Sequence, residues 1–285
     1  MEMAMMNASE SNNGRRINGD NRAAPGSAEA AFGAQQVMSA AQRPTPGRKS
    51  IEAVSLNALL ANKLLAALPG KDFERLLPHL EPVTLDAGED LYDSEGGIPF
   101  AYFPETAVVS HLYVLADGNT TEATMIGREG VAGLSAIFGA RQPCYWTRAL
   151  IAGSALKIRM DILKQEFGRG RALQRSILAY AGARIAQLSQ RAVCSGRHKV
   201  RQRLCCWLLM LHDRAGEDQF QLTHELIASS LGVRRAGITE HANALRDGNI
   251  ISYSRGLVRV LDRQRLEAAA CECYQMLGQP TAHVL

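Results

Sequence analysis

The distribution of apolar residues divides the chain into a polar N-terminal segment and a longer, more apolar remainder. Residues 1–50 are rich in Asn, Ser, Gly, Ala, Gln and Pro and contain few large apolar side chains. Such a segment cannot bury enough surface to offset the entropy of ordering it, so we expect a disordered tail with one short helix over 28–41. From residue 57 leucines follow helical spacing as far as Pro69, and a second short helix is expected over 71–80.

Short apolar or alternating stretches recur from residue 82 to residue 160, separated by turns that contain glycine. The Asp117-Gly118 pair lies between two of these stretches and is a good signal for a β-hairpin. The expected strands are 82–85, 91–93, 101–103, 107–115, 121–126, 147–151 and 155–158. Many short strands with closely spaced turns predict an antiparallel sandwich or barrel, here with a helical insert near 133–138.

A helical period dominates residues 159–193. Apolar side chains recur there at steps of three to four residues, namely Ile162, Phe167, Leu173, Ile177, Leu178, Ile185 and Leu188. Small residues gather between 179 and 186, where they would allow a second helix to approach closely. We therefore expect a long helix that pairs with the same helix of a second copy; packing on its own domain is the alternative.

Residues 221–251 have the pattern of a helix-turn-helix. Thr223 is expected to cap a first helix over 224–230, and Gly232 can take the positive φ that a tight turn requires. A second helix is expected over about 234–247, with apolar positions directed inward. A generic two-helix turn in an α-helical domain is the alternative.

Direct contact with DNA is expected from the second helix and from a wing that follows it. Arginine suits guanine or phosphate, asparagine can pair with adenine, and glutamate can accept a hydrogen bond from cytosine. Two short strands over 250–261, joined by 254–256, predict the wing. The candidate DNA-binding residues are Thr223, Arg234, Arg235, Gly237, Thr239, Glu240, Asn243, Arg255 and Lys199. The expected major-groove contacts are Arg234, Arg235, Thr239 and Asn243, and the expected backbone contacts are Arg255 and Lys199.

Charge adds a modest argument for an anionic partner. The chain has 285 residues, of which 46% are hydrophobic, and a formal net charge of +4. Residues 197–270 contain twelve Lys and Arg and eight Asp and Glu, so their excess of four positive charges equals that of the whole chain. A localised basic excess favours a nucleic-acid partner, although many enzymes are equally basic.

The six cysteines give no metal-binding pattern in the sequence. None forms a C-x-x-C pair, and no Cys/His cluster has zinc spacing. Cys205 and Cys206 fit small core residues, while Cys271 and Cys273 are two residues apart in an expected helix and would not share a face. We therefore expect no metal, and free thiols of the kind found in a reducing cytoplasm.

The sequence also lacks the motifs of common enzymes and of membrane proteins. No dinucleotide-binding glycine motif, P-loop, nucleophile elbow or H-E-x-x-H motif occurs, so no catalytic residue is expected. No apolar run reaches the roughly 18 residues that a membrane helix needs, and the N-terminus has no secretory apolar region. We expect a cytoplasmic protein that is not an enzyme and does not bind a membrane.

The order of short strands, a long helix and a winged helix-turn-helix resembles the cyclic-AMP receptor protein and fumarate–nitrate regulator (Crp/Fnr) family of bacterial transcription factors. The resemblance covers roughly residues 57–270 and is most specific over 227–235 and 247–251. It implies an α+β chain with an N-terminal β-roll of the jelly-roll, cyclic-nucleotide-binding-like kind. The expected domains are a tail over 1–50, the β-roll effector-type domain over 51–160, a dimerisation helix over 161–195 and a winged helix-turn-helix over 196–275.

The resemblance implies a sequence-specific transcription regulator that binds a two-fold symmetric site in double-stranded DNA as a homodimer, with RNA polymerase as a partner. Two departures concern the recognition helix. Ala236 stands where the family usually has Glu, and Glu240 stands where several members have a second Arg. The family's base preference is therefore not carried over, and the alternative of a small-ligand sensor with a weakened DNA-binding domain stays open.

The effector implied by the resemblance is not identified by the sequence. Members that bind cyclic nucleotides hold the sugar and phosphate with a Gly-Glu-Leu and an Arg-Ser/Thr-Ala cassette, but Gly133 replaces this Glu and 144–146 replace the Arg. Because the phosphate would lack a cationic partner, we expect neither a cyclic nucleotide nor another cofactor. Iron–sulfur members have an N-terminal cysteine cluster, which is missing before Cys144. His79 and His111 are candidate haem ligands, with a surface or structural role as the alternative.

Overall fold

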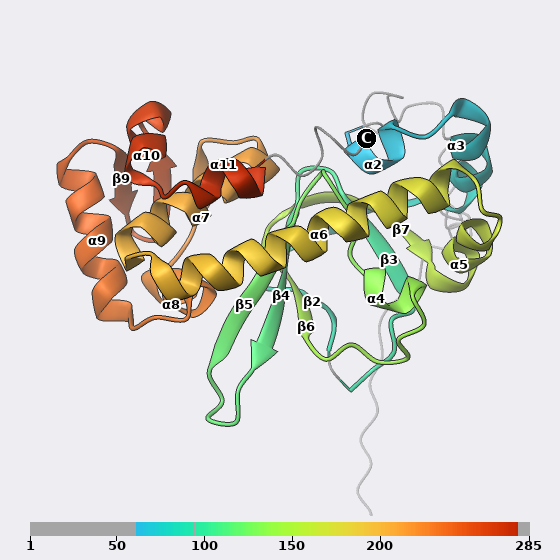
Figure 1. The fold of residues 1–285 in the computed structure, drawn as a ribbon, viewed down its shortest axis with the longest axis horizontal. Coiled ribbons are helices and arrows are strands. Elements are labelled where there is room, and N and C mark those ends of the chain that lie inside the picture. Colours follow the sequence, from blue (N-terminus) through green and yellow to red (C-terminus); the bar gives the residue numbers. More distant parts are fainter. Residues whose placement is uncertain (1–60, 94, 279–285) are drawn as a thin grey trace, which may run out of the picture. The chain divides into compact units, whose positions relative to one another are not determined.

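The computed structural model of the chain describes residues 61–93 and 95–278. The expected tail over 1–50, its short helix over 28–41 and the beginning of the first leucine-rich helix lie outside these residues. The described part contains a β-roll, a long helix and a C-terminal winged helix-turn-helix (Figure 1). None of its helices is both long enough and apolar enough to cross a membrane.

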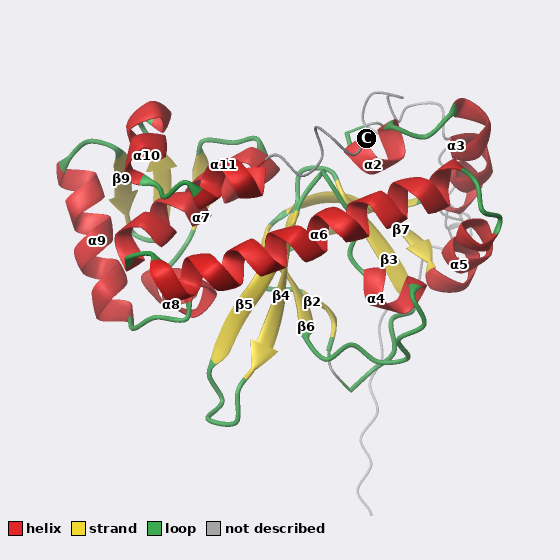
Figure 2. Ribbon diagram, viewed as in Figure 1, coloured by secondary structure: helices red, strands yellow, loops and turns green. Residues whose placement is uncertain are grey.

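Two antiparallel sheets form the roll (Figure 2). One has the strand order β1-β7-β3 and the other β2-β6-β4-β5. The strands are β1 Glu81–Leu85, β2 Asp90–Tyr92, β3 Phe100–Pro104, β4 Val108–Val114, β5 Thr120–Ile126, β6 Trp146–Ile151 and β7 Gly153–Arg159. They confirm the strands expected from alternation, and the turn between β4 and β5 contains Gly118 at a φ of +80°.

Short helices cover the roll. They are α2 Lys63–Ala66, α3 Gly70–Leu76, the 3-10 helix η2 Leu77–His79, α4 Leu134–Ile137 and α5 Met160–Gly168. The buried side chain of Asn62 accepts hydrogen bonds from the first turn of α2 and donates to the carbonyl oxygens of Pro104 and Gly130. This single amide therefore fixes α2 to the roll, whose core includes Phe103, Leu156 and Ile158.

The long helix α6 (Ala172–Arg197) runs from the roll to the C-terminal domain (Figure 1). The helical region expected over 161–195 is interrupted between α5 and α6, where Gly170 adopts a φ of +68°. A positive φ suits glycine and ends a right-handed helix. The apolar period continues across Gly170, so the sequence pattern does not reveal this break. Leu173 and Ile177 are buried against the roll.

The C-terminal domain contains the expected helix-turn-helix and wing. Its elements are α7 Val200–Ala215, β8 Gln219–Gln221, α8 His224–Leu231, α9 Arg235–Asp247, β9 Ile251–Ser254, β10 Leu257–Val260, α10 Arg263–Ala269 and α11 Cys273–Gly278. The sequence indicated only the two strands of the wing, whereas the sheet has a third strand, with the order β8-β10-β9. Trp207 and Leu245 lie in its core, which continues into the roll through Val108 and Met125.

Candidate DNA-binding interface

The first helix of the motif, α8, has the local structure that its sequence predicts. The hydroxyl oxygen of Thr223 accepts a hydrogen bond from the backbone N–H of Leu226 at 3.1 Å, which caps the helix. Gly232 adopts a φ of +62° at the C-terminal end, and the N–H of Val233 donates to the carbonyl oxygen of Ala228 at 3.0 Å. The expected cap and tight turn are both confirmed.

The second helix, α9, presents its polar face to solvent. It begins at Arg235, with Arg234 in the extended N-cap position. Ile238, Ala242 and Leu245 are buried, as the apolar spacing predicts. These three anchors fix the rotation of α9 about its axis, so the residues between them face outward.

The nine candidate residues differ in accessibility. The exposed ones are Thr223, Arg234, Arg235, Glu240, Arg255 and Lys199, and the half-buried ones are Gly237, Thr239 and Asn243. Among the described residues, the side chains of Arg234, Arg235 and Arg255 have no hydrogen-bond or ion-pair partner. An exposed guanidinium without an internal partner is free to bind an external anion or the acceptors of guanine.

The side chain of Thr239, expected from the sequence to contact DNA, forms two hydrogen bonds within the domain. Its hydroxyl lies 3.0 Å from Nδ1 of His224 and donates to the carbonyl oxygen of Arg235 at 3.2 Å. The ring of His224 stacks on Tyr253 of the wing, with ring centroids 4.2 Å apart. Burial, together with the charge of Arg235, lowers the pKa of His224. A neutral imidazole thus joins α8, α9 and the wing, and sequence analysis did not find this role.

The wing presents a single arginine at its tip. β9 and β10 pair in antiparallel register, with Ser254 opposite Leu257. Arg255, between them, is exposed and adopts a φ of +51°. The expected wing is confirmed, and Arg255 lies at its tip as the sequence predicts. Lys199, the other expected backbone contact, is not part of the wing. It lies at the N-cap of α7, just after the end of α6.

A groove of about 1000 Å³ separates the start of α9 from the β4–β5 hairpin of the roll. Arg234 and Arg235 line one side of it, and Leu112 and Thr120 line the other. At its floor α8 contacts β5, because the hydroxyl of Ser229 donates to the carbonyl oxygen of Thr120 at 2.8 Å. The helix-turn-helix is therefore docked on the hairpin in this conformation.

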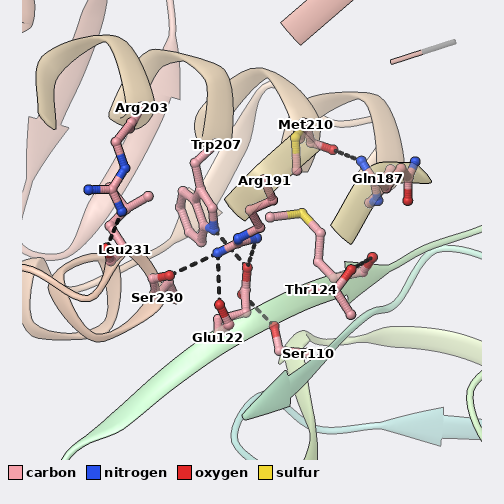
Figure 3. A network of polar contacts seen from close by, with 12 residues as sticks. Ser110, Glu122, Thr124, Gln187, Arg191, Arg203, Trp207, Met210, Ser230 and Leu231 are labelled. Atoms are coloured by element: carbon pink, nitrogen blue, oxygen red, sulfur yellow. Dashed lines mark hydrogen bonds and ion pairs between the residues drawn. The ribbon is translucent and has the colours of Figure 1, made fainter. Parts of the chain in front are cut away.

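A buried carboxylate beside this contact joins four elements (Figure 3). Glu122 of β5 accepts hydrogen bonds from Ser110 of β4 at 2.7 Å and from Trp207 of α7 at 3.1 Å. Arg191 of α6 donates to the same carboxylate at 3.0 Å and to the carbonyl oxygen of Ser230 in α8 at 2.9 Å. Sequence analysis did not identify Glu122, since one polar residue in an alternating strand is typical of a solvent-facing position.

The region expected to hold an effector is occupied by side chains of the roll. Tyr145 stacks on His111, with ring centroids 4.1 Å apart, and its hydroxyl lies 2.8 Å from that of Ser135. Burial lowers the pKa of His111 to about 3, with a smaller contribution from the charge of Arg184. Of the two histidines considered for haem, His79 is exposed and His111 is buried in this stack.

Comparisons with known proteins agree with this architecture. Residues 202–269 match the family model of the Crp-like helix-turn-helix domain. A search of curated proteins finds no match.

Solved structures share the fold over most of the described chain. FixK2 from Bradyrhizobium japonicum has a TM-score of 0.58 at 18% identity and covers 67% of this chain and 98% of its own. TTHB099, a CRP-family transcriptional regulator from Thermus thermophilus, has a TM-score of 0.57 at 18% identity and covers 66% and 96%. The c-di-GMP responsive global regulator CLP from Xanthomonas campestris has a TM-score of 0.54 at 15% identity and covers 67% and 99%.

Residues 202–269 are therefore a Crp-like helix-turn-helix domain, which lies after a β-roll and a long helix and makes the chain a DNA-binding transcription regulator with the fold of these solved structures.

Proposed function

We propose that the chain acts as a homodimer on a two-fold symmetric DNA site, with α9 of each protomer in the major groove. The observation that supports this most directly is the pair of exposed guanidinium groups on Arg234 and Arg235, which have no partner among the described residues. Asn243 lies on the same helix and would contact base edges, while Arg255 and Lys199 would contact phosphates. Thr223, Gly237, Thr239 and Glu240 complete the proposed interface.

The proposed dimer contact is the outer face of α6. Leu178, Ile185 and Leu188 are 50%, 67% and 41% exposed, which is unusual for large apolar side chains on one helix. Gly182 lies between them, with open space where a Cβ would stand. Pairing two such faces would bury the apolar side chains and would fix two recognition helices about 34 Å apart, one turn of DNA.

The small residues of α6 fall into two sets that differ in burial. Ala181 and Ala183 are buried against the same chain, whereas Gly182 and Ala186 are exposed. Only the second pair is therefore available for close approach by another helix.

We propose that the roll does not bind a cyclic nucleotide. Gly133, which replaces the family's ribose-binding Glu, has a φ of +100°, and a Cβ there would meet Met160 at 3.0 Å. A glutamate at this position would therefore be strained. The stacked pair of Tyr145 and His111 supplies no cation for a phosphate. Any other effector would act by changing the contact between α8 and β5, and its identity is not assigned.

The proposed partners and cellular location follow from the role in transcription. The partners are double-stranded DNA, a second copy of the chain and RNA polymerase, with no surface assigned to the polymerase. Such a regulator would work in the cytoplasm, and we propose no catalytic activity and no membrane contact for it.

The decisive experiment selects bound sites from a random-sequence DNA library at two salt concentrations. The expected result is a palindromic motif whose binding weakens steeply as salt rises, because phosphate contacts release counterions. Weak binding without a motif would overturn the proposal. It would favour the alternative of a small-ligand sensor acting through protein contacts, for which the docking of α8 on β5 is the supporting observation.

A further inference from the structure

Three cysteines and one histidine that are far apart in the sequence meet at the end of α6. Cys194 and His198 lie one turn apart there, whereas Cys271 lies between α10 and α11 and Cys273 is the first residue of α11. The three sulfur atoms and one imidazole nitrogen all lie within 4.8 Å of one another. All three cysteines are buried, so the cluster is shielded from solvent.

Two of the six separations between these atoms match tetrahedral coordination. The sulfur atoms of Cys194 and Cys271 are 3.6 Å apart, and the sulfur of Cys273 is 3.5 Å from Nδ1 of His198. Zinc bonds of about 2.3 Å to sulfur and 2.0–2.1 Å to nitrogen place tetrahedral ligand atoms about 3.4–3.8 Å apart. A disulfide would require about 2.05 Å between the two sulfur atoms, much less than their separation here.

Two neighbouring side chains orient the ligand atoms. Nε2 of His198 lies 3.2 Å from a carboxylate oxygen of Glu272, which places the imidazole proton on Nε2 and leaves the Nδ1 lone pair directed at Cys273. The side-chain amide of Gln190 donates to the sulfur of Cys273 at 3.0 Å. A carboxylate behind a ligating histidine and a donor to a ligating thiolate are typical surroundings of metal sites in proteins.

We propose that Cys194, His198, Cys271 and Cys273 form a structural Zn²⁺ site. Four protein ligands of the Cys₃His type close the coordination sphere, so the site would be structural rather than catalytic. The ion would fasten the C-terminal segment to the last turn of α6, across the junction where α6 gives way to α7. It would therefore fix the winged helix-turn-helix to the long helix.

The competing interpretation is a cluster of protonated thiols in an apolar core. Burial raises the pKa of Cys194, so without a metal its thiol would stay neutral. Cys205 provides the comparison, since it is also buried and burial raises its pKa to about 12, yet it does not belong to the cluster. The two interpretations differ in metal content, which is directly measurable.

The test measures the metal content of the full chain, purified under reducing conditions and dialysed to remove weakly bound ions. The expected result is one zinc per chain. Replacement by Co²⁺ should give the visible absorption and thiolate charge-transfer bands of a tetrahedral sulfur-rich site. Cys273→Ala should lose the zinc on dialysis, because only three protein ligands remain, and Glu272→Ala should weaken zinc binding by about 10- to 100-fold.

Matched variants separate loss of the metal from loss of folding. Cys205→Ala removes a buried thiol outside the cluster and should keep one zinc per chain. His198→Cys should also keep the zinc, as a Cys₄ site, and should change the cobalt spectrum. Chelation should lower the melting temperature of the unmodified chain but not that of Cys273→Ala.

Four outcomes would overturn the proposal, and three of them concern metal content. They are an unmodified chain without zinc, equal zinc in the unmodified chain and Cys273→Ala, and iron with sulfide in place of zinc. The fourth is a Cys194–Cys271 disulfide that persists in metal-free protein purified under reducing conditions. None of these measurements involves DNA, so they are independent of the proposed operator binding.

Discussion

The guanidinium of Arg191 forms an ion pair with the fully buried carboxylate of Glu122 at 3.0 Å. Arg191 belongs to α6 and Glu122 to β5, so the pair ties the long helix to the hairpin that also contacts α8. The same carboxylate accepts from Trp207 of α7. This buried charge therefore helps to hold the DNA-binding domain on the roll.

Glu122→Ala should lower the free energy of unfolding by about 3–5 kcal/mol, because it leaves a largely buried guanidinium without its counter-charge. The measurement is urea unfolding. The control is Asp90→Ala, which breaks the bidentate but exposed pair with Arg148 and should cost less than about 1 kcal/mol. Equal losses in the two variants would contradict a special role for Glu122.

Arg235→Ala should reduce affinity for the selected operator by roughly 1–3 kcal/mol and relax its sequence preference, because an exposed cation at the start of α9 is lost. The measurement compares binding to the operator and to random DNA at fixed salt. Arg246→Ala serves as the control, since Arg246 is in the last turn of the same helix and pairs with Asp247. An unchanged ratio between specific and random DNA for Arg235→Ala would exclude direct readout by this residue.

Ile185→Glu should convert the proposed dimer into monomers, because two carboxylates would face each other at the centre of the α6 contact. Light scattering coupled to size-exclusion chromatography gives the mass directly. Leu261→Glu provides a control, since Leu261 is a similarly exposed apolar residue (52%) of the C-terminal domain. A dimer that persists in Ile185→Glu would place the contact elsewhere.

The stability of the roll should fall in acid because of His111. Its folded-state pKa of about 3 lies below the ordinary value of 6.5, so the unfolded chain binds the proton first. The contribution of His111 is fully present above about pH 6.5 and is lost by up to about 1.4 kcal/mol per pH unit as the pH falls towards 3.

His111→Phe keeps the ring stacked on Tyr145 and removes the titrating group. Unfolding measured between pH 7 and pH 4 should show a shallower loss of stability in this variant. The exposed His79, changed to Phe, is the control. Parallel curves for the unmodified chain and His111→Phe would show that other groups cause the acid sensitivity.

Local patterns in the sequence were sufficient to predict most elements. The alternation of apolar and polar residues located the strands of the roll. The cap at Thr223 and the turn at Gly232 located the helix-turn-helix. All of these signals depend on residues that are close in the sequence. The break at Gly170 was missed, since an apolar period continues across it. The third strand β8 was missed because it contains a single apolar residue, Phe220, between two glutamines.

The features missed by the sequence analysis depend on contacts between distant residues. Glu122 and Arg191 are 69 positions apart, and no local pattern connects them. The prediction that Cys271 and Cys273 do not share a helix face assumed that both lie within a helix. The structure shows that α11 begins at Cys273, so Cys271 precedes it and the rule does not apply. The expectation of no metal rested on this assumption and on the absence of zinc-like spacing, which ligands from distant segments do not show.

The length of α6 makes it a lever between the roll and the DNA. Its 26 residues span about 39 Å at 1.5 Å per residue. A tilt of about 5° at the roll would move the far end by about 3 Å, close to the 3.4 Å rise of one base-pair step. A displacement at the roll no larger than a side-chain rearrangement could therefore shift the recognition helix by one step along the operator.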